Sequence, residues 1–338
     1  MGKEKIFLIT GITGHLGRNV ASLLLEKGEK VRGFVLKGDN KLFLDRFPRP
    51  ENLKIYYGDI RNEEEVEALF EGTKEKEVYL IHCAALITLV KKKDQRVYDV
   101  NVNGTKNITD AAIRHKVHKY VYVSSTDTIP KKGKQIIEDI KVYDEKKIKG
   151  CYGKTKTIAS AYVLNACKGK INASLALPSG ILGPNDFYGA RMNRMIYQYR
   201  IGKLHSAMSG GYDMVDVRDV AKGVIAILKK GKKNESYILS NSHYDIVTLL
   251  DMVSEITGQK KIRHVIPRWV VILSTPFLSI QAKLHHQKPQ VTAHSMKMIG
   301  KNTYLSHAKA ERELGYHPRE MKETIKDIVE WVEENPPE

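Results

Sequence analysis

The chain has 338 residues, of which 42% are hydrophobic, so it is long enough for one large domain or two moderate ones. Its net charge of +17 comes from scattered lysines without interleaved aromatic residues, which favours a solvated basic surface over a nucleic-acid interface. The three cysteines show neither a disulfide framework nor metal-site spacing, which predicts a cytoplasmic protein without a bound metal.

Two apolar stretches bear on membrane insertion. The N-terminal stretch "MGKEKIFLIT" is typical of a strand that runs into a glycine turn, not of a signal peptide. The stretch 266–280 is interrupted by Arg268 and Pro276 and is too short to span a bilayer. We therefore expect a soluble protein without stable membrane insertion, with a small molecule as its partner and no nucleic acid.

Short β-branched runs alternate with helical patterns in the first half of the chain. The pattern predicts strands at 5–10, 30–36, 53–59, 77–85, 119–125 and 172–178, and helices at 14–27, 62–70, 95–115 and 152–168. Strands that are apolar on both faces and alternate with helices indicate a parallel sheet covered on both sides. The predicted fold class is therefore α/β, with a doubly wound (Rossmann) parallel sheet in residues 1–178.

The pattern changes after Pro178. Turn-rich segments separate predicted helices at 247–256, 268–283 and 320–334, and one clear strand is expected at 236–240. We interpret residues 179–338 as a smaller C-terminal lobe that is mainly substrate-binding, with segments that return to the Rossmann domain.

A glycine-rich loop follows the first predicted strand. In "TGITGHLG", the residues Gly11, Gly14 and Gly17 are spaced Gly-x-x-Gly-x-x-Gly. Such a loop lets the backbone turn tightly and approach a pyrophosphate at a helix N-terminus. An apolar strand precedes the loop and an amphipathic helix follows it, so we expect a dinucleotide cofactor here.

The end of the second strand bears on the choice between NAD and NADP. A carboxylate there selects NAD through the ribose hydroxyls, whereas a cation accommodates the 2′-phosphate of NADP. The strand runs into Lys37, and the first acid is Asp39, beyond a glycine. Lys37 and Arg18 are either phosphate ligands or plain surface cations. The pattern favours NADP, with NAD as the alternative.

The stretch "CYGKTK" at 151–156 holds a tyrosine and a lysine one helical turn apart, on the same face. A tyrosine is a poor base at neutral pH, and a nearby ammonium favours the phenolate and lowers its pKa. The strand at 119–125 ends in Ser124 and Ser125, which mark either a turn or a hydroxyl that holds a substrate oxygen. Tyr152 and Lys156 are therefore candidates for a proton relay.

Taken together, these motifs resemble the extended short-chain dehydrogenase/reductase family, which is epimerase/dehydratase-like. The resemblance rests also on "YGDIRN", "HCAA", "NVNGTKN" and the C-terminal "AERELGYHPREMKETIKDIVEWVEEN", and it covers nearly the whole chain. It implies that Tyr152 is the acid/base and that Lys156 binds the nicotinamide ribose and lowers the tyrosine pKa. It also implies that Ser125, or its neighbour Ser124, holds the substrate oxygen and that Asn101 braces the site.

The same resemblance implies the cofactor contacts. Asp59 would contact the adenine amino group, Ile60 would pack on the ring, and the backbone after the fourth strand would line the cofactor. The expected cofactor-binding residues are Gly11, Thr13, Gly14, His15, Leu16, Gly17, Arg18, Lys37, Asp59, Ile60, Ala84, Ala85, Tyr152, Lys156 and Pro178.

Within the family, "LPSGILGPNDF" and "GGYDMVDVRDVAKGV" resemble the dihydroflavonol-reductase-like and 3β-hydroxysteroid-dehydrogenase-like branch. That branch implies an NAD(P)-dependent oxidoreductase that interconverts a ketone and a secondary alcohol on a small, apolar or cyclic substrate. Sugar-nucleotide epimerases usually carry an asparagine where this chain has Ser179 and Gly180, which weakens that alternative.

A non-catalytic cofactor-sensing or RNA-binding protein on the same fold is a further alternative, because a fold does not determine a function. The family resemblance also implies a homodimer, formed by the helices at 101–116 and 152–168.

Overall fold

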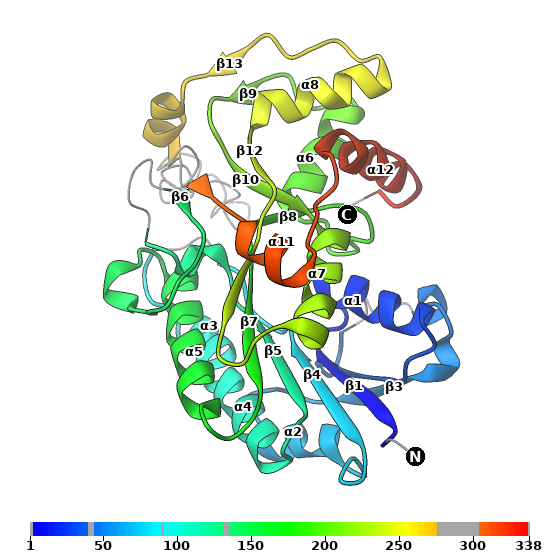
Figure 1. Cartoon of the computed structure of the whole chain (residues 1–338). Helices are drawn as coiled ribbons and strands as arrows, with labels where there is room; N and C mark the ends of the chain where they lie inside the picture. Colours follow the sequence, from blue (N-terminus) through cyan, green and yellow to red (C-terminus); the bar gives the residue numbers. More distant parts are fainter. Residues whose placement is uncertain (1–2, 40–43, 89–90, 131–135, 276–303, 337–338) are drawn as a thin grey trace.

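A parallel sheet of seven strands forms the centre of the computed structural model, which describes residues 3–39, 44–88, 91–130, 136–275 and 304–336 (Figure 1). The strand order is β11-β7-β5-β4-β1-β2-β3, so the order reverses between β1 and β4. Doubly wound folds bind ligands at this reversal, beyond the carboxyl ends of the strands. The predicted fold class is therefore confirmed. The strands are β1 (Lys5–Thr10), β2 (Val31–Val35), β3 (Leu53–Tyr57), β4 (Glu77–His82), β5 (Lys119–Val123), β7 (Ala173–Pro178) and β11 (Ser236–Leu239).

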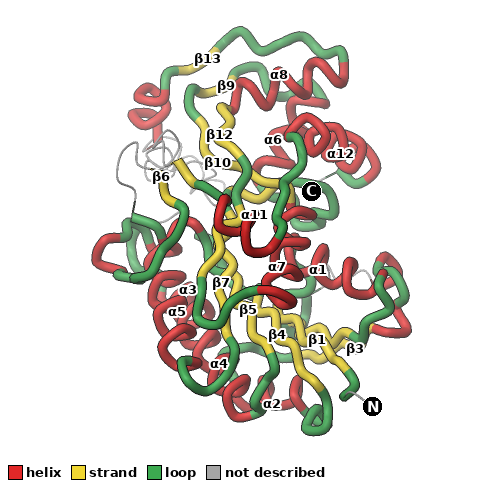
Figure 2. The backbone as a smooth tube through the Cα atoms, viewed as in Figure 1, coloured by secondary structure: helices red, strands yellow, loops and turns green. Residues whose placement is uncertain are grey.

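Helices cover both faces of this sheet (Figures 1 and 2). Neighbouring residues of β1 point to opposite faces: Phe7 and Ile9 join one buried cluster, and Ile6 and Leu8 join the other. Burial on both faces explains why the strands are apolar throughout. One cluster includes side chains of α1 (His15–Glu26), α7 (Val217–Lys230) and α11 (Ala308–Leu314), and the other those of α2 (Glu63–Phe70), α4 (Thr105–Arg114) and α5 (Cys151–Cys167).

The segment predicted as one helix at 95–115 is divided. It consists of α3 (Gln95–Tyr98), a π-helical stretch (Asp99–Gly104) and α4. Single π-helical turns inside α-helices are frequent at functional sites. The segment is helical from Gln95 to Arg114, as predicted, but the apolar periodicity gave no sign of the π-helical stretch from which Asn101 makes its long-range contacts.

The second half of the chain builds a smaller lobe above the sheet, as Figure 1 shows. Its core packs three helices around a three-stranded sheet, of the order β12-β10-β8. Only the strand at 236–240 was expected in this half, and it is β11, which pairs with β7 at the edge of the main sheet. The elements of the lobe are β8 (Gly180–Leu182), α6 (Arg191–Arg200), β10 (Gly211–Asp216), β12 (Ser242–Asp245), α8 (Ile246–Thr257) and α12 (Met321–Glu334).

Two short parallel pairs and four 3-10 turns complete the described elements. Residues 268–275 are helical, and the remainder of the helix expected at 268–283 lies outside the described residues. In the ranges that the structure describes, no helix has the length and apolar character needed to cross a membrane. The pairs are β6 (Ile136–Ile137) with β14 (Tyr304–Leu305) and β9 (Ala207–Met208) with β13 (Val265–Ile266); the turns are Leu44–Arg46, Pro50–Asn52, Thr126–Thr128 and Glu145–Lys147.

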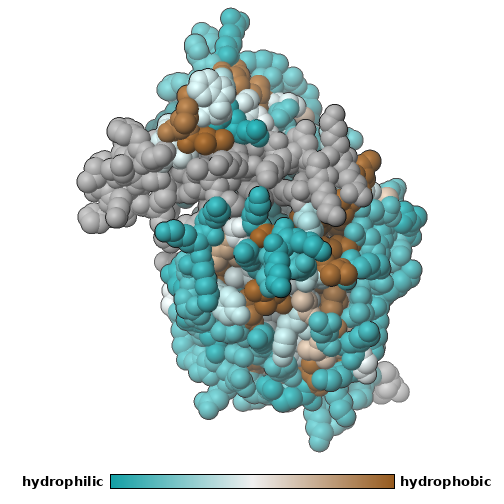
Figure 3. All heavy atoms as spheres, turned by 90° about the vertical axis from the view of Figure 1, so that its left-hand side faces the viewer, coloured by the Kyte–Doolittle hydropathy of each residue, from teal (hydrophilic) through white to brown (hydrophobic). Residues whose placement is uncertain are grey.

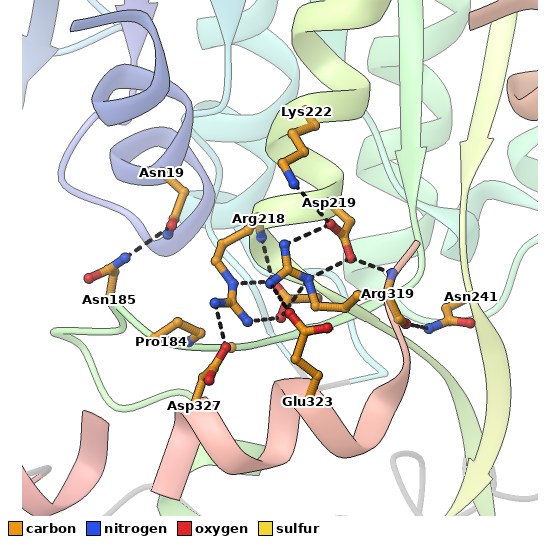
Figure 4. Close-up of polar contacts among 12 residues, drawn as sticks. Asn19, Pro184, Asn185, Arg218, Asp219, Lys222, Asn241, Arg319, Glu323 and Asp327 are labelled. Atoms are coloured by element: carbon orange, nitrogen blue, oxygen red, sulfur yellow. Dashed lines mark hydrogen bonds and ion pairs between the residues drawn. The ribbon is translucent and has the colours of Figure 1, made fainter. Parts of the chain in front are cut away.

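A buried ion-pair network joins the start of α7 to the C-terminal segment (Figure 4). The Arg319 guanidinium donates to both carboxylate oxygens of Asp219, at 2.9 and 3.0 Å. The Arg218 guanidinium donates to Asp216 at 2.6 and 3.0 Å and lies 2.6 Å from Asp327 of α12. The carboxylates of Asp216 and Asp219 are almost completely buried, so these contacts fix α12 and the lobe onto α7.

We predict that Arg319→Ala lowers the free energy of unfolding by about 3–5 kcal/mol, because it leaves a buried carboxylate without its main partner. The matched control is Arg200→Ala, which breaks an ion pair with Glu333 whose side chains are 37% and 47% exposed. Exposed pairs contribute about 1 kcal/mol or less. Urea unfolding monitored by circular dichroism measures both changes, and equal midpoints for the two variants would contradict the prediction.

Candidate active site

The glycine-rich loop between β1 and α1 fits a pyrophosphate. The amide of Gly14 donates to the carbonyl of Gly11 at 3.0 Å and closes a tight turn. A Cβ on Gly17 would lie 2.1 Å from the carbonyl oxygen of Gly11, so no larger residue fits there. Helix α1 begins after Gly14 without a side-chain cap and without an acid in its first turn. The free amides of this helix end suit a phosphate.

Asp39 and Lys37, which follow β2, form hydrogen bonds and ion pairs with different partners. Asp39 accepts hydrogen bonds from Thr13 in the glycine-rich loop at 2.8 Å and from the Tyr188 hydroxyl at 2.6 and 2.7 Å. The ammonium of Lys37 lies 2.6 Å from Glu65 and is largely exposed. Glu65 also accepts from the amide of Asp59, and the Lys37 ammonium holds the pKa of Glu65 below its usual value. Both charges therefore border the expected adenosine site.

Arg18 packs against aromatic side chains. Its side chain is buried, with the guanidinium carbon 4.2 Å from the centre of the Phe47 ring and 4.6 Å from that of Phe187. Burial lowers its pKa to about 10. The structure thus places Arg18 beside two aromatic rings, a typical cation–π arrangement.

The expected adenine contacts lie beyond β3. The carboxylate of Asp59 accepts the Nε of Arg61 at 3.0 Å, and this hydrogen bond holds its pKa below the usual value. Ile60 is buried and its carbonyl accepts from Asn107 at 3.1 Å. An open pocket beside them is lined by Asp59, Arg61, Asn62, Glu65, Asp99 and Asn103.

His82, at the end of β4, has a role that the sequence reading did not assign. Its ring nitrogens lie 2.6 Å from the Thr10 hydroxyl and 3.0 Å from the Thr105 hydroxyl. Burial, and then the charge of Lys156, lower its pKa to about 3, so the imidazole is neutral. Thr10 also accepts from the amide of Ala84 at 3.3 Å. His82 therefore connects the strand before the glycine-rich loop to the start of α4.

Tyr152, in the first turn of α5, lies beside the turn that follows β5. A Cβ on Gly153 would come within 2.9 Å of the carbonyl oxygen of Asp127, so a glycine is needed for this close approach. Burial and the charge of Asp127 raise the pKa of Tyr152, and a hydrogen bond with Ser125 opposes them. The hydroxyls of Tyr152 and Ser125 are thus neighbours, and the tyrosine is protonated at neutral pH.

The two serines at the end of β5 have different surroundings. The Ser124 hydroxyl is buried and lies 2.6 Å from that of Ser160, which itself donates to the carbonyl of Lys156. The Ser125 hydroxyl is partly exposed and accepts the amide of Asp127 at 3.1 Å. Ser125 interacts with Tyr152, whereas the Ser124 hydroxyl lies against Ser160 of α5.

Lys156 is buried one turn along α5, with 2% of its surface exposed. Its ammonium donates to the carbonyl oxygen of Val123 at 2.6 Å and lies 4.2 Å from the centre of the Tyr122 ring. Burial lowers its pKa to about 7. The lysine thus holds α5 against the end of β5.

Asn101 links three segments around this helix. Its side-chain carbonyl accepts the amide of Leu86 at 2.8 Å, and its amide group donates to the Leu86 carbonyl at 3.0 Å. It also donates to the hydroxyl of Thr155 at 3.1 Å, and Thr155 donates to the carbonyl of Tyr152 at 2.8 Å. Asn101 therefore ties the loop after β4 to the turn of α5 that carries the tyrosine. Cys151 makes a similar link, because its sulfur accepts the amide of Asp94 at 3.4 Å.

The smaller lobe closes the other side of the site. The Tyr212 ring lies against Gly180 just beyond β7. Burial raises the pKa of the Tyr212 hydroxyl, and the charges of Arg191 and Asp127 also affect it.

The lobe is also tied to the cofactor loop, because His15 lies within hydrogen-bond distance, 2.8 Å, of the Pro184 carbonyl. Asn185 donates to Asn19 of α1 at 3.2 Å (Figure 4). Pro178, the remaining expected contact, is buried at the end of β7.

Sequence comparison finds relatives along almost the entire chain. A protein named sterol demethylase protein B from Methylococcus capsulatus is 27% identical over 97% of this chain and 98% of its own length. A Synechocystis protein named after dihydroflavonol 4-reductase is 28% identical, over 97% and 94%. A 3-beta-hydroxysteroid dehydrogenase from Mycolicibacterium neoaurum is 27% identical, over 92% and 86%.

Solved structures show the same fold. The crystal structure of gox2253 matches with a TM-score of 0.80 and 26% identity, over 98% of each chain. A UDP-glucose 4-epimerase from Thermotoga maritima matches with a TM-score of 0.74 and 21% identity, over 97% of this chain and 99% of that one.

The NAD dependent epimerase/dehydratase family matches residues 7–240, which include the glycine-rich loop, Asn101, Ser125 and the pair on α5. The resemblance to extended short-chain dehydrogenases/reductases is confirmed by this match and by the relatives along the chain. The chain belongs to the NAD dependent epimerase/dehydratase family of oxidoreductases.

Proposed function

We propose that this protein interconverts a ketone and a secondary alcohol on an apolar cyclic substrate, with a nicotinamide dinucleotide as the hydride carrier. One observation carries the proposal: the Tyr152 and Ser125 hydroxyls are neighbours beyond the end of β5, with Lys156 one turn along the same helix. This arrangement supplies a proton donor and a hydrogen-bond partner for one substrate oxygen.

Each of these residues has a separate role in the proposed reaction. The cofactor, when bound, supplies or accepts the hydride, and the α1 N-terminus holds its pyrophosphate. Ser125 donates a hydrogen bond to the substrate oxygen and thereby positions the carbonyl. Tyr152 gives its proton to that oxygen during reduction and takes the proton back during oxidation. Lys156, in its protonated form, stabilises the phenolate that forms. In the structure, however, burial and Asp127 raise the Tyr152 pKa, and Lys156 is not among the groups that lower it, contrary to the expectation from the family resemblance.

The wall opposite Tyr152 favours an apolar ring over a sugar nucleotide. The position after β7 carries no side-chain amide for a diphosphate, and the Tyr212 ring covers Gly180 there. The names of two relatives, a 3-beta-hydroxysteroid dehydrogenase and a sterol demethylase protein, support a polycyclic, sterol-like substrate class. Epimerase chemistry is the second candidate, and its support is the family match over residues 7–240 together with the shared fold.

We also propose a preference for NADP over NAD, with Lys37 as the residue that reads the 2′-phosphate. Lys37 is exposed at the edge of the adenosine site, and its ammonium can move from Glu65 to a phosphate group. Asp39 is the opposing feature, because a carboxylate near the ribose favours NAD. Its hydrogen bonds to Thr13 and Tyr188 direct it toward the glycine-rich loop.

We predict that Tyr152→Phe lowers kcat by about 10²–10⁴-fold, the usual contribution of a positioned acid/base, while the Kd of the cofactor stays within about twofold. The matched control is Tyr162→Phe on the same helix, where the lost hydroxyl donates to Asp110. Steady-state kinetics with a 3-ketosteroid and fluorescence titration of the cofactor measure both quantities. Undiminished turnover in Tyr152→Phe would remove the tyrosine from the mechanism.

We predict that Lys37→Gln raises the KM for NADP(H) about tenfold or more, the worth of one charge-assisted hydrogen bond, and leaves the KM for NAD(H) nearly unchanged. Lys30→Gln, which loses an exposed ion pair with Glu4, serves as the control. The readout is the ratio of the two KM values in each variant. If that ratio is the same in Lys37→Gln and in the wild type, Lys37 does not read the phosphate.

The burial of Lys156 lowers the free energy of unfolding, and the size of this effect depends on pH. The pKa of Lys156 is about 7 in the folded protein and 10.5 for an unperturbed lysine, so the unfolded chain binds more protons between these values. The lysine's contribution to the free energy of unfolding therefore rises with pH across this window, by at most about 1.4 kcal/mol per pH unit.

We predict that Lys156→Met is more stable than the wild type at pH 7 and that this difference shrinks toward pH 10. Urea unfolding of the cofactor-free protein at several pH values tests it, because the other lysines are common to both proteins. A difference that does not change with pH would contradict the low pKa of Lys156.

A further inference from the structure

An exposed apolar rim lies on the smaller lobe, at β13 and the helix 268–275 that follows it. Figure 3 shows apolar side chains gathered on the upper part of the molecule, where Figure 1 places β13. Trp269 is 65% exposed and Leu273 is 71% exposed. Monomeric proteins rarely leave such side chains together in water without a function. The rim consists of Val265, Ile266, Trp269, Val270 and Leu273.

The local structure directs these side chains outward. Trp269 and Leu273 are one helical turn apart and therefore share a face. The hydroxyls of Ser274 and Thr275 donate back to the helix carbonyls of Val271 and Ile272, at 2.9 and 2.8 Å. Polar groups at this end of the helix are thus satisfied within it, and the outer face is left to apolar side chains.

The two sequence stretches that form and adjoin the rim carry positive charge and no acid. The sequence contains no Asp or Glu between Asp186 and Asp213 or between Glu255 and Glu311, and these two stretches supply β9 and β13. Lys203, Lys260 and Arg263 of these stretches are exposed, and within the described ranges no carboxylate forms an ion pair with them, whereas Lys261 pairs with Asp251 and Glu255. A surface that combines exposed Trp and Leu with unbalanced cations is complementary to anionic lipid headgroups above an apolar layer.

We propose that the apolar rim of the smaller lobe binds the surface of an anionic lipid bilayer. Trp269 and Leu273 enter the boundary between headgroups and acyl chains, and Lys203, Lys260 and Arg263 contact lipid phosphates. RNA is the less suitable partner, because single-stranded nucleic acid needs a series of stacking aromatic rings and this rim carries one, Trp269. The binding is peripheral and does not require a membrane-spanning helix.

The rim is joined to the wall of the active site. The amide of Arg268 donates to the Ser209 hydroxyl at 3.1 Å, and the amide of Ser209 donates to the Ile266 carbonyl at 3.1 Å. Tyr212, which covers Gly180 in the site, follows three residues after Ser209. Membrane binding is a property separate from the proposed reaction. It explains the exposure of the apolar side chains of the rim whatever the substrate is.

The test is cosedimentation of the full chain with vesicles of phosphatidylcholine alone or mixed with phosphatidylglycerol. We expect binding to the mixed vesicles only, weakened by added salt. Trp269→Ser with Leu273→Ser should reduce binding at least tenfold, and Lys260→Gln with Arg263→Gln severalfold. The matched control is Lys168→Gln with Lys170→Gln, which removes two exposed charges between α5 and β7, at the end of the molecule away from β13, and should leave binding unchanged. Turnover and circular dichroism check that each variant folds.

A second readout reports on the rim itself. The chain has two tryptophans, so Trp331→Phe leaves Trp269 as the sole indole, and its emission should shift to shorter wavelength when mixed vesicles are added. Three results would overturn the proposal: no cosedimentation with either vesicle, equal loss in the Lys168/Lys170 control, or a self-associated protein in which a second copy covers Trp269. Binding of RNA with loss in the same rim variants, and not of vesicles, would also overturn it.

Discussion

The buried ammonium of Lys156 is the constraint on which the site depends. Its hydrogen bond to the Val123 carbonyl, at 2.6 Å, holds the first turn of α5 against the end of β5. That contact brings Tyr152 to Ser125, and Gly153 allows the close approach. A charge buried in this way lowers stability, which a purely structural residue would avoid. The cost is understandable if a positive charge is needed beside a reacting phenol.

Two further sets of hydrogen bonds fix the position of the site relative to the cofactor loop. Asn101 ties the loop after β4 to Thr155 on α5, and His82 ties β1 to the start of α4. Both act through neutral hydrogen bonds between buried groups, which are specific in direction and costly to leave unmade. The lobe is joined to this frame by the Arg319 network and by the contact of His15 with Pro184. The proposed reacting groups therefore lie on regular elements of the sheet domain, and the lobe packs beside them.

The sequence predicted much of the fold and of the candidate site, and the elements that it missed were missed for physical reasons. The strands of the first half were predicted because burial on both faces makes them apolar throughout, and β1 was expected at 5–10, where it lies. The short strands β8 and β12 were missed, since three or four residues carry too little periodicity. Tyr152 and Lys156 are visible as a local motif. Thr155 and His82 act through partners more than 20 residues away, at Asn101 and Thr105, which no local pattern reveals.

Hydride transfer with net oxidation of the cofactor is the central claim, and isotope transfer tests it directly. The protein is incubated with NADPH deuterated at the reactive carbon of its nicotinamide and with a 3-ketosteroid as the probe. The account predicts one deuterium in each product alcohol and one oxidised cofactor for each alcohol formed. If the steroid gains no deuterium, while a parallel incubation with UDP-glucose gives its epimer without net oxidation or reduction of the cofactor, the protein is an epimerase and the account is wrong.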